Sequence, residues 1–236
     1  MKFGGYGMKV GIMQPYFLPY LGYWQLMNAV DTYVVYDDVN YISRGWINRN
    51  NFLVQGSAKL FTFSLNKASI NKKINEISVL DDFATFVTML KCHYKKAPYF
   101  ETMMPLVEKI ISYDKTNLGE FLFNSIKIVA EYLDFNTNIV LSSALEKDNS
   151  LKGNEKILSI CKLLGADEYY NAIGGQELYD KEDFAKNGIK LSFLKTNFTP
   201  YRQFKNSFVP GLSILDVMMF NSKEQVKQML NDFELI

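Results

Sequence analysis

Histidine and cysteine are scarce in this 236-residue sequence, and its net charge is small. The single histidine, His93, excludes a metal centre built from several histidines. The two cysteines, Cys92 and Cys161, are far apart and form no CxxC pair, so neither a disulfide framework nor a cysteine metal site is predicted, and a reducing cytoplasm fits best. A formal net charge of +1 gives no reason to expect nucleic acid as a partner.

Long apolar runs are also missing. None approaches the roughly 18 residues that a membrane-spanning helix needs, so no membrane span is predicted. Residues 1–7 contain glycines where a signal peptide would need an apolar core. We interpret them as a disordered leader, with Met8 as an alternative start. Residues 1–236 are interpreted as a single α/β domain, whose 48% hydrophobic content allows a sizeable core.

Phenylalanine and tyrosine, by contrast, are abundant. Aromatic residues make up 15% of the chain, with 18 phenylalanines and 15 tyrosines. One interpretation is a core rich in these two residue types, and the other is a set of aromatic walls around a flat or sugar-like ligand. Composition alone favours the first.

Segments with the two-residue period of strands alternate with segments of helical period. Strands are expected at 10–13, 33–36, 51–54, 59–64, 74–79, 138–141, 168–171 and 189–194. Helices are expected at 21–28, from 82 to a break at Pro98, from Pro105 to 111, and at 119–133, 152–164, 181–186, 213–220 and 224–232. This alternation predicts an α/β protein with a mostly parallel sheet, a helical middle at about 82–134 that forms an insertion or lid, and C-terminal helices.

Polar side chains gather after the first two expected strands. Gln14 follows the first strand, and Asp37 and Asp38 end the second. With the helix between them these strands form a right-handed βαβ unit, whose strand ends are a usual place for ligands. Neighbouring strand residues face opposite ways, so at most one aspartate points into a shared cleft. We assign Gln14 to substrate binding and Asp37 to catalysis, as a base or with Mg²⁺ and phosphate oxygens; the alternative is an ordinary strand-ending turn.

Arg44, Asn48 and Arg49 follow in a polar segment flanked by Tyr41 and Trp46. Arginine suits two-point recognition of a phosphate or a carboxylate. A solvated loop is the alternative interpretation. Two arginines and an asparagine beside two large aromatic residues favour substrate binding by Arg44, Asn48 and Arg49.

Further candidates lie at later strand ends and at one helix end. Substrate binding is assigned to four residues expected along one rim of the sheet, for each of which an ordinary turn residue is the alternative: Ser143, Asn171, Gly174 and Gly175. His93 precedes two lysines at the end of a helix, where basic residues complement the helix dipole. Histidine is also the side chain that exchanges protons near neutral pH, so His93 is the second catalytic candidate.

Five segments between residues 12 and 221 carry a family resemblance. They are IMQPYFLPYLGYWQL, VYDDVNYISRGWINRN, HYKKAPYF, ICKLLGADEYYNAIGG and LSILDVMMFN. They resemble the WbqC-like family, and the first two segments are specific. That family is associated with surface-polysaccharide (O-antigen) biosynthesis, so the resemblance implies a biological context more than a mechanism.

A second resemblance concerns Tyr20-Leu21-Gly22-Tyr23, which lies after the first strand and before an apolar helix. It is similar to the H-x-G-H motif of nucleotidyltransferases and pantothenate-synthetase-like ligases, with both histidines replaced by tyrosine. The resemblance implies a nucleotidyltransferase (HUP)-like N-terminal half and ligand binding by Tyr20 and Tyr23. The motif histidines stabilise charge on transferring phosphates, so their replacement argues against nucleotidyl transfer.

Two functional hypotheses follow. The first is an enzyme of surface-polysaccharide or nucleotide-sugar biosynthesis that transfers an acyl or aminoacyl group to an amino sugar, using ATP and Mg²⁺ as pantothenate-synthetase-like ligases do. The second is a non-catalytic nucleotide-sugar binding or accessory protein, consistent with the missing histidines. Both take a nucleotide or nucleotide-sugar as a small-molecule ligand, and no metal site built from protein ligands is predicted.

Overall fold

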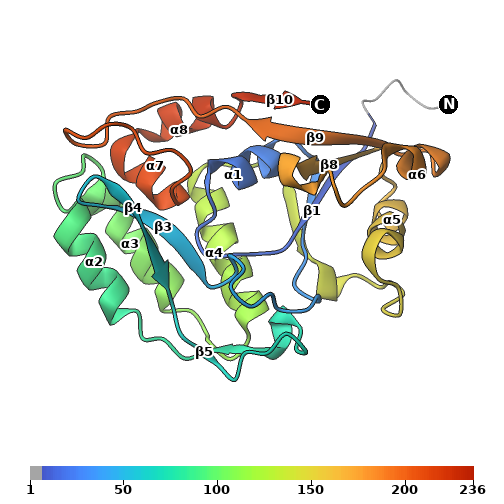
Figure 1. Ribbon diagram of the computed structural model, residues 1–236, viewed down its shortest axis with the longest axis horizontal. Helices are drawn as coiled ribbons and strands as arrows, with labels where there is room; N and C mark the ends of the chain where they lie inside the picture. Colours follow the sequence, from blue (N-terminus) through green and yellow to red (C-terminus); the bar gives the residue numbers. More distant parts are fainter. Residues whose placement is uncertain (1–6) are drawn as a thin grey trace.

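A six-stranded sheet forms the centre of the computed structural model, which describes residues 7–236; the predicted leader at 1–7 lies almost entirely outside them. The strand order is β10-β9-β8-β1-β2-β7, and all pairings are parallel except that of β10 with β9 (Figure 1). The prediction of an α/β protein with a mostly parallel sheet is confirmed. The strands are β1 (Lys9–Met13), β2 (Thr32–Val35), β7 (Asn138–Leu141), β8 (Glu168–Ala172), β9 (Lys190–Thr196) and β10 (Phe233–Leu235).

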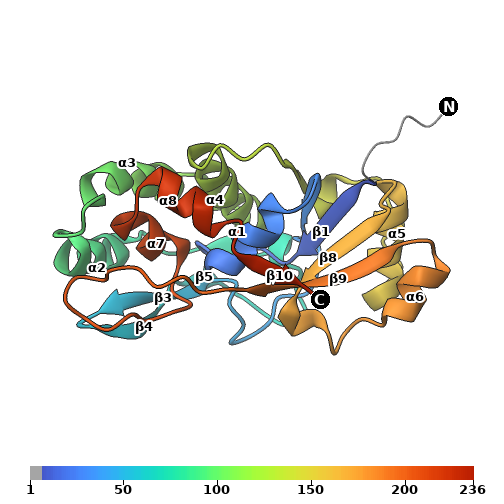
Figure 2. The same cartoon turned by 90° about the horizontal axis from the view of Figure 1, so that it is seen from above.

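Helices cover both faces of the sheet, and Figure 2 shows α1 and α5 on opposite sides of it. Because side chains alternate along a strand, Tyr33 and Tyr170 face the core shared with α1, while Val10 and Ile12 face α5 and α6. The helices are α1 (Leu21–Asn28), α2 (Ala84–Tyr94), α3 (Phe100–Ile111), α4 (Leu118–Tyr132), α5 (Gly153–Leu163), α6 (Lys181–Lys186), α7 (Ile214–Phe220) and α8 (Lys223–Met229).

The order of the parallel strands reverses at β1. From β1 the chain moves to β2 and then β7 on one side, and later forms β8 and β9 on the other side. Neighbouring strands β1 and β8 are therefore followed by helices on opposite faces, α1 and α6. Such a switch point leaves a crevice at the carboxyl ends of the strands, which is where open α/β sheets bind ligands. The order is compatible with the nucleotidyltransferase-like half that the second resemblance implies.

A second group of elements lies to one side of the sheet (Figures 1 and 2). It contains the antiparallel hairpin of β3 (Arg49–Val54) and β4 (Ser57–Thr62), with α2, α3 and α7 close by. Its centre is aromatic, since Phe17 contacts several rings at centroid distances of 5.2–6.5 Å: Phe61, Phe63, Phe83, Phe86 and Phe121. Much of the phenylalanine therefore fills the core, as composition favoured. The helical middle expected at 82–134 corresponds to α2, α3 and α4.

Local structure differs from expectation in three places. The expected strand 74–79 is the 3₁₀ turn Ile74–Glu76 followed by the short strand β6 (Ser78–Val79), which pairs with the two-residue strand β5 (Leu65–Asn66). Pro105 lies inside α3 rather than at its start, where it removes a single backbone hydrogen bond. Strand β10 pairs with β9 and was not expected. Among the described residues, no helix is long and apolar enough to cross a membrane.

Candidate functional site

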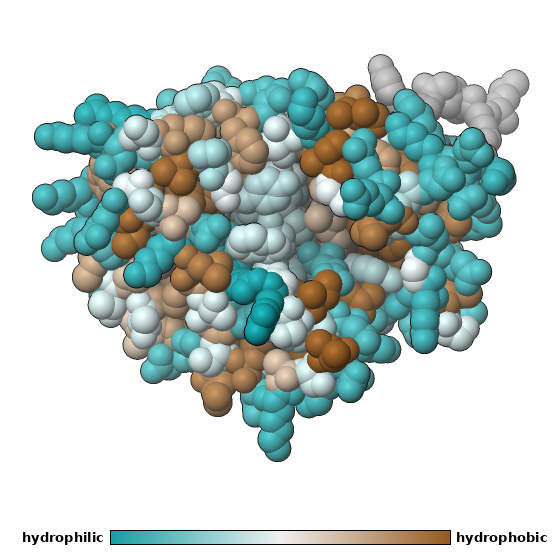
Figure 3. Space-filling view, viewed as in Figure 1, coloured by the Kyte–Doolittle hydropathy of each residue, from teal (hydrophilic) through white to brown (hydrophobic). Residues whose placement is uncertain are grey.

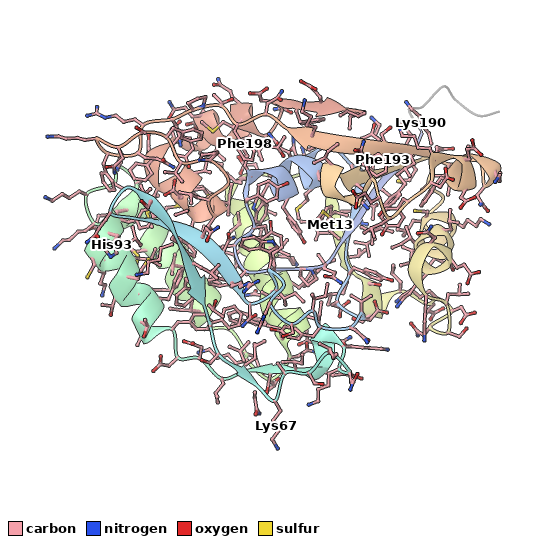
Figure 4. The ribbon with its side chains drawn as sticks, in the orientation of Figure 1. Met13, Lys67, His93, Lys190, Phe193 and Phe198 are labelled. Atoms are coloured by element: carbon pink, nitrogen blue, oxygen red, sulfur yellow. The ribbon has the colours of Figure 1, made fainter. Side chains whose placement is uncertain are left out.

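A hollow of about 430 Å³ opens at the carboxyl ends of β1 and β8, at the switch point of the sheet. We call it the switch-point hollow. Figure 4 labels Met13, one of its residues, near the middle of the molecule, and Figure 3 shows the surface hollowed in this region. Its lining is Ile12, Met13, Gln14, Pro15, Tyr16, Tyr36, Ile42, Gly45, Trp46, Ile47, Ile157, Asn171, Ala172, Gly174, Gly175, Leu178 and Tyr179.

The structure brings together four of the predicted binding residues in this hollow: Gln14, Asn171, Gly174 and Gly175. Asn171 is fixed in place, because its Nδ2 donates to the Tyr169 hydroxyl (3.0 Å) and its Oδ1 accepts from the Ala172 amide (2.7 Å). A Cβ added at Gly175 would lie 3.0 Å from Asn171 Nδ2, so the glycine makes room for this amide. Gln14 is only half-buried, and within residues 7–236 its amide has no hydrogen-bond partner. Gln14 can therefore bond a ligand.

Aromatic walls flank these amides. Tyr16, Tyr36, Trp46 and Tyr179 line the hollow, and Trp46 keeps 51% of its surface exposed. Burial, reinforced by the nearby carboxylate of Asp38, raises the pKa of Tyr36 well above its ordinary value, so this phenol stays neutral near neutral pH. Neutral rings around a few polar groups suit a flat or sugar-like ligand, the second interpretation of the aromatic content.

Asp37 lies beside the hollow but does not line it. Its Oδ1 accepts from the Ser143 amide (2.9 Å), and its Oδ2 accepts from the Ser143 hydroxyl (2.6 Å) and from Asn75 Nδ2 (3.2 Å). These bonds tie the end of β2 to the end of β7 and to the turn at Asn75. Asp37 and Ser143, predicted for catalysis and binding, are thus engaged with each other, and we leave both out of the candidate site.

Asp38, which like Asp37 lies beyond the end of β2, has different partners and pairs with two lysines. Lys147 Nζ and Lys156 Nζ both lie 3.0 Å from its Oδ2, and all three side chains are at most 7% exposed. Burial alone would raise the pKa of Asp38, but the Ser142 hydroxyl and the two ammonium groups hold it below its ordinary value. One carboxylate shared by two ammonium groups leaves one net positive charge. Sequence reasoning missed both lysines because they lie more than a hundred residues beyond Asp38.

This positive group touches a wall of the hollow. Lys156 Nζ lies over the ring of Tyr36, 5.2 Å from its centroid, and the next residue, Ile157, lines the hollow directly. A cation held against an aromatic face is stabilised by the ring and stays close to whatever occupies the hollow. The arrangement favours an anionic ligand.

Arg49 supplies a second cation near the hollow. Its guanidinium carbon lies 5.8 Å from the ring centroid of Trp46, its Nε is buried without a hydrogen-bond partner, and it has no ion pair within the described part of the chain. Neither arginine is among the residues that line the hollow. Arg44 is exposed and has a left-handed backbone (φ 61°). Asn48 is buried: its Oδ1 accepts a hydrogen bond from the Tyr41 hydroxyl (3.0 Å), and its Nδ2 donates one to the Phe63 carbonyl (2.6 Å). Of these three predicted residues, Arg49 is the one that packs on a residue lining the hollow, the ring of Trp46.

The start of α1 is closed by the chain itself. Tyr20 bridges to Ser213 and its ring packs near Phe198, while a Cβ on Gly22 would fall 2.2 Å from Thr196 Oγ1. Tyr23 is fully buried, in ring contact with Tyr33 at 5.3 Å. The two tyrosines of the motif similar to H-x-G-H therefore lie in packed surroundings, and neither lines the switch-point hollow.

His93 lies far from these residues. Figure 4 shows it on α2, at the opposite side of the molecule from the strands of the sheet, in a different hollow. A catalytic pair of Asp37 and His93 is therefore not assembled in the switch-point hollow.

Magnesium finds no ligands in the switch-point hollow. No carboxylate is among its lining residues, the oxygens of Asp37 accept three hydrogen bonds, and Asp38 is paired with lysines. Within residues 7–236 no cluster of three or more histidine, cysteine, aspartate or glutamate side chains is positioned to hold a metal. The residues present do not fit a protein-held Mg²⁺.

The fold is that of a doubly wound α/β protein with an aromatic-walled hollow at the switch point of its sheet. The chain belongs to the WbqC-like protein family, whose model matches residues 14–228, so the resemblance seen in the five segments is confirmed. It is similar to the uncharacterized protein Rv1507c of Mycobacterium tuberculosis (strain ATCC 25618 / H37Rv), with 26% identity over 218 residues that cover 90% of this chain and 93% of the relative. No solved structure matches significantly.

Proposed function

We propose that this protein acts in surface-polysaccharide (O-antigen) biosynthesis and binds a nucleotide or nucleotide-sugar in the switch-point hollow. One observation carries the proposal: the hollow coincides with the switch point between β1 and β8 and combines aromatic walls, a free amide and nearby unpaired positive charge. Bases and sugars stack on aromatic rings, and phosphates pair with cations. The family membership supplies the biosynthetic context.

In the enzymatic form of this proposal, the protein joins an acyl or aminoacyl group to an amino sugar at the expense of ATP. Its own residues bind and orient the reactants: Gln14 and Asn171 bond the polar edge of the ligand, and the aromatic walls exclude water. Arg49 and the Asp38–Lys147–Lys156 group favour phosphate charge. Any Mg²⁺ would arrive with the nucleotide phosphates rather than on a protein carboxylate.

The second candidate is a non-catalytic nucleotide-sugar binding or accessory protein. The residues that line the hollow favour this second candidate. Their titratable side chains are tyrosines, whose phenols stay neutral near neutral pH, and the lining contains neither a histidine nor a carboxylate. Proton transfer in the enzymatic form would have to rely on the reactants themselves or on a group that moves in with them.

Incubation with ATP, Mg²⁺, a UDP-linked amino sugar and a panel of carboxylic and amino acids separates the two forms. The enzymatic form predicts release of AMP and pyrophosphate in equal amounts, together with an amide product detected by mass spectrometry. Calorimetric binding of the UDP-sugar without any turnover across the panel supports the accessory form. Failure of every nucleotide and nucleotide-sugar to bind overturns the proposal.

A further inference from the structure

A larger hollow of about 810 Å³ lies away from the switch point, between the end of α2 and the loop before α7. Figure 4 shows His93, one of its residues, far from Met13 of the switch-point hollow. We call it the basic hollow. Its lining is Lys91, Cys92, His93, Lys95, Lys96, Pro98, Arg202, Phe204, Lys205, Asn206 and Phe220.

Positive charge is concentrated here without compensation. Lysine and arginine contribute five of the lining residues, and none of the lining residues is an aspartate or glutamate. In the described part of the chain, none of these five cations forms an ion pair. Elsewhere lysines are paired, as Lys223 and Lys227 are with Asp134. In a protein with a formal net charge of only +1, this local excess is a marked departure from the average.

The helix dipole does not account for all of this charge. Lys91 lies in the last turn of α2 and Lys95 directly follows it, and basic residues at those positions stabilise the helix. Arg202 and Lys205, however, come from a different segment more than a hundred residues later and face the same hollow. Two separate segments therefore bring their cations together.

The floor of the basic hollow is apolar. The rings of Phe204 and Phe220 meet edge to face with centroids 4.7 Å apart, and Pro98 adjoins them in the lining. Phe204 keeps a left-handed backbone (φ 56°), a strained conformation for such a residue, and its carbonyl accepts a hydrogen bond from Arg202 Nε (3.1 Å). An apolar floor beneath a rim of cations suits a molecule with an anionic head and an apolar body.

Both walls of the hollow are fixed by the same buried carboxylate. Asp216, which is fully buried, accepts hydrogen bonds from Tyr94 Oη (2.7 Å), Tyr201 Oη (2.5 Å) and Gln203 Nε2 (2.9 Å). Tyr94 is the last residue of α2, whereas Tyr201 and Gln203 flank Arg202. The cations are thus presented by segments that are already ordered, which lowers the entropic cost of binding a ligand.

We propose that the basic hollow binds an amphiphilic anion, a phosphate or diphosphate joined to an apolar chain or ring. The phosphate oxygens pair with the lysines and with Arg202, and the apolar part packs on Phe204 and Phe220. Each half of the hollow then contributes, so neither the phosphate alone nor the apolar part alone binds as well as the two joined. This site is separate from the nucleotide site proposed above and does not depend on it.

Cys92 provides a direct reporter of occupancy. It is exposed and lines the basic hollow, whereas the other cysteine, Cys161, is buried and its pKa is raised to about 12 by burial. Alkylation of the native protein with iodoacetamide therefore modifies Cys92 selectively. The probes are geranyl diphosphate, inorganic pyrophosphate and geraniol, each tested for protection of Cys92 and for heat of binding.

The proposal predicts that geranyl diphosphate slows Cys92 alkylation and binds at least tenfold more tightly than pyrophosphate, while geraniol gives no protection. The double variant Arg202→Gln, Lys205→Gln should weaken geranyl diphosphate at least tenfold. The control Lys162→Gln, Lys186→Gln removes two exposed lysines of α5 and α6 and should leave binding unchanged.

Three results overturn the proposal. One is unchanged Cys92 alkylation at millimolar geranyl diphosphate with no heat of binding. Another is equal affinity for pyrophosphate and geranyl diphosphate, which would make the hollow a simple anion site. The third is binding to phosphatidylglycerol vesicles without affinity for soluble geranyl diphosphate, which would make this face a membrane-docking surface.

Discussion

Lys156 Nζ lies 3.0 Å from Asp38 Oδ2, although 118 residues separate the two in sequence. The pair ties α5 to the end of β2, and Lys147 completes it with a second contact of 3.0 Å. The same lysine packs on Tyr36, a wall of the switch-point hollow. A single buried charge cluster thus supports both the fold and the surroundings of the candidate site.

Substitution of the carboxylate of this cluster should lower stability more than substitution of one of its lysines. Lys156→Met leaves Asp38 paired with Lys147, so we expect a loss of about 1–3 kcal/mol in the free energy of unfolding. Asp38→Asn leaves two buried ammonium groups facing each other and should cost more, about 3–5 kcal/mol. Urea unfolding followed by circular dichroism measures both; equal losses, or a smaller loss for Asp38→Asn, would contradict the assignment of the cluster.

The Asp38 pairing also predicts a pH dependence of stability. The folded-state pKa of Asp38 lies below its ordinary value of 3.8. The contribution of Asp38 to the free energy of unfolding is therefore complete above the ordinary value and is lost as pH falls through the folded-state pKa. The difference in unfolding free energy between the parent and Asp38→Asn should be constant near neutral pH and shrink below about pH 4. A difference that grows on acidification would show that the carboxylate is not stabilised by its partners.

Tyr94 connects three segments and should be sensitive to loss of its hydroxyl. The hydroxyl donates to Asp216 (2.7 Å) and accepts from the Leu53 amide (2.6 Å), and all three residues are buried. Tyr94→Phe leaves a buried carboxylate and a buried amide each short of a partner, so we expect a loss of about 1–3 kcal/mol in stability. Tyr132→Phe, at a partly exposed tyrosine whose hydroxyl forms no hydrogen bond within residues 7–236, serves as the control and should be nearly neutral.

Arg49 and Arg44 form a matched pair for testing the anion site. Arg49→Lys loses the planar two-point geometry beside Trp46, and nucleotide-sugar affinity should fall by about 1.5–3 kcal/mol while thermal stability changes little. Arg44→Lys changes an exposed arginine that does not pack on Trp46, so this variant should bind like the parent. Calorimetric titration of both variants decides the matter: equal affinities for the two would remove Arg49 from the site.

Periodicity located the elements well where one face of a segment is buried. The predicted bounds of α1, β7 and α6 coincide with the structure. The site was harder to predict because it depends on which partner each polar side chain meets. Asp37 is engaged by Ser143, 106 residues later, and Asp38 by lysines further still; no local pattern reveals such pairings.

The location of His93 was also not predictable from local sequence. Its residue type pointed to catalysis, but the chain places it among lysines in the basic hollow, away from the carboxyl ends of the strands. Gln14, Asn171 and the two glycines lie together, as predicted for one rim of the sheet, because the carboxyl ends of neighbouring parallel strands must meet at one edge. Topology therefore located the hollow, and tertiary packing decided which polar groups remain free within it.

Trp46 offers the most direct measurement of nucleotide or nucleotide-sugar binding in the switch-point hollow. The chain has two tryptophans, of which Trp24 is fully buried in the core and Trp46 is 51% exposed on the wall of the hollow. Titration with ATP and with UDP-linked amino sugars should change the fluorescence of the parent saturably. It should leave that of Trp46→Phe unchanged, and Phe198→Ala, an exposed aromatic residue elsewhere, should respond like the parent. Calorimetric affinities identical in the parent and Trp46→Ala, with no fluorescence change, would contradict the account.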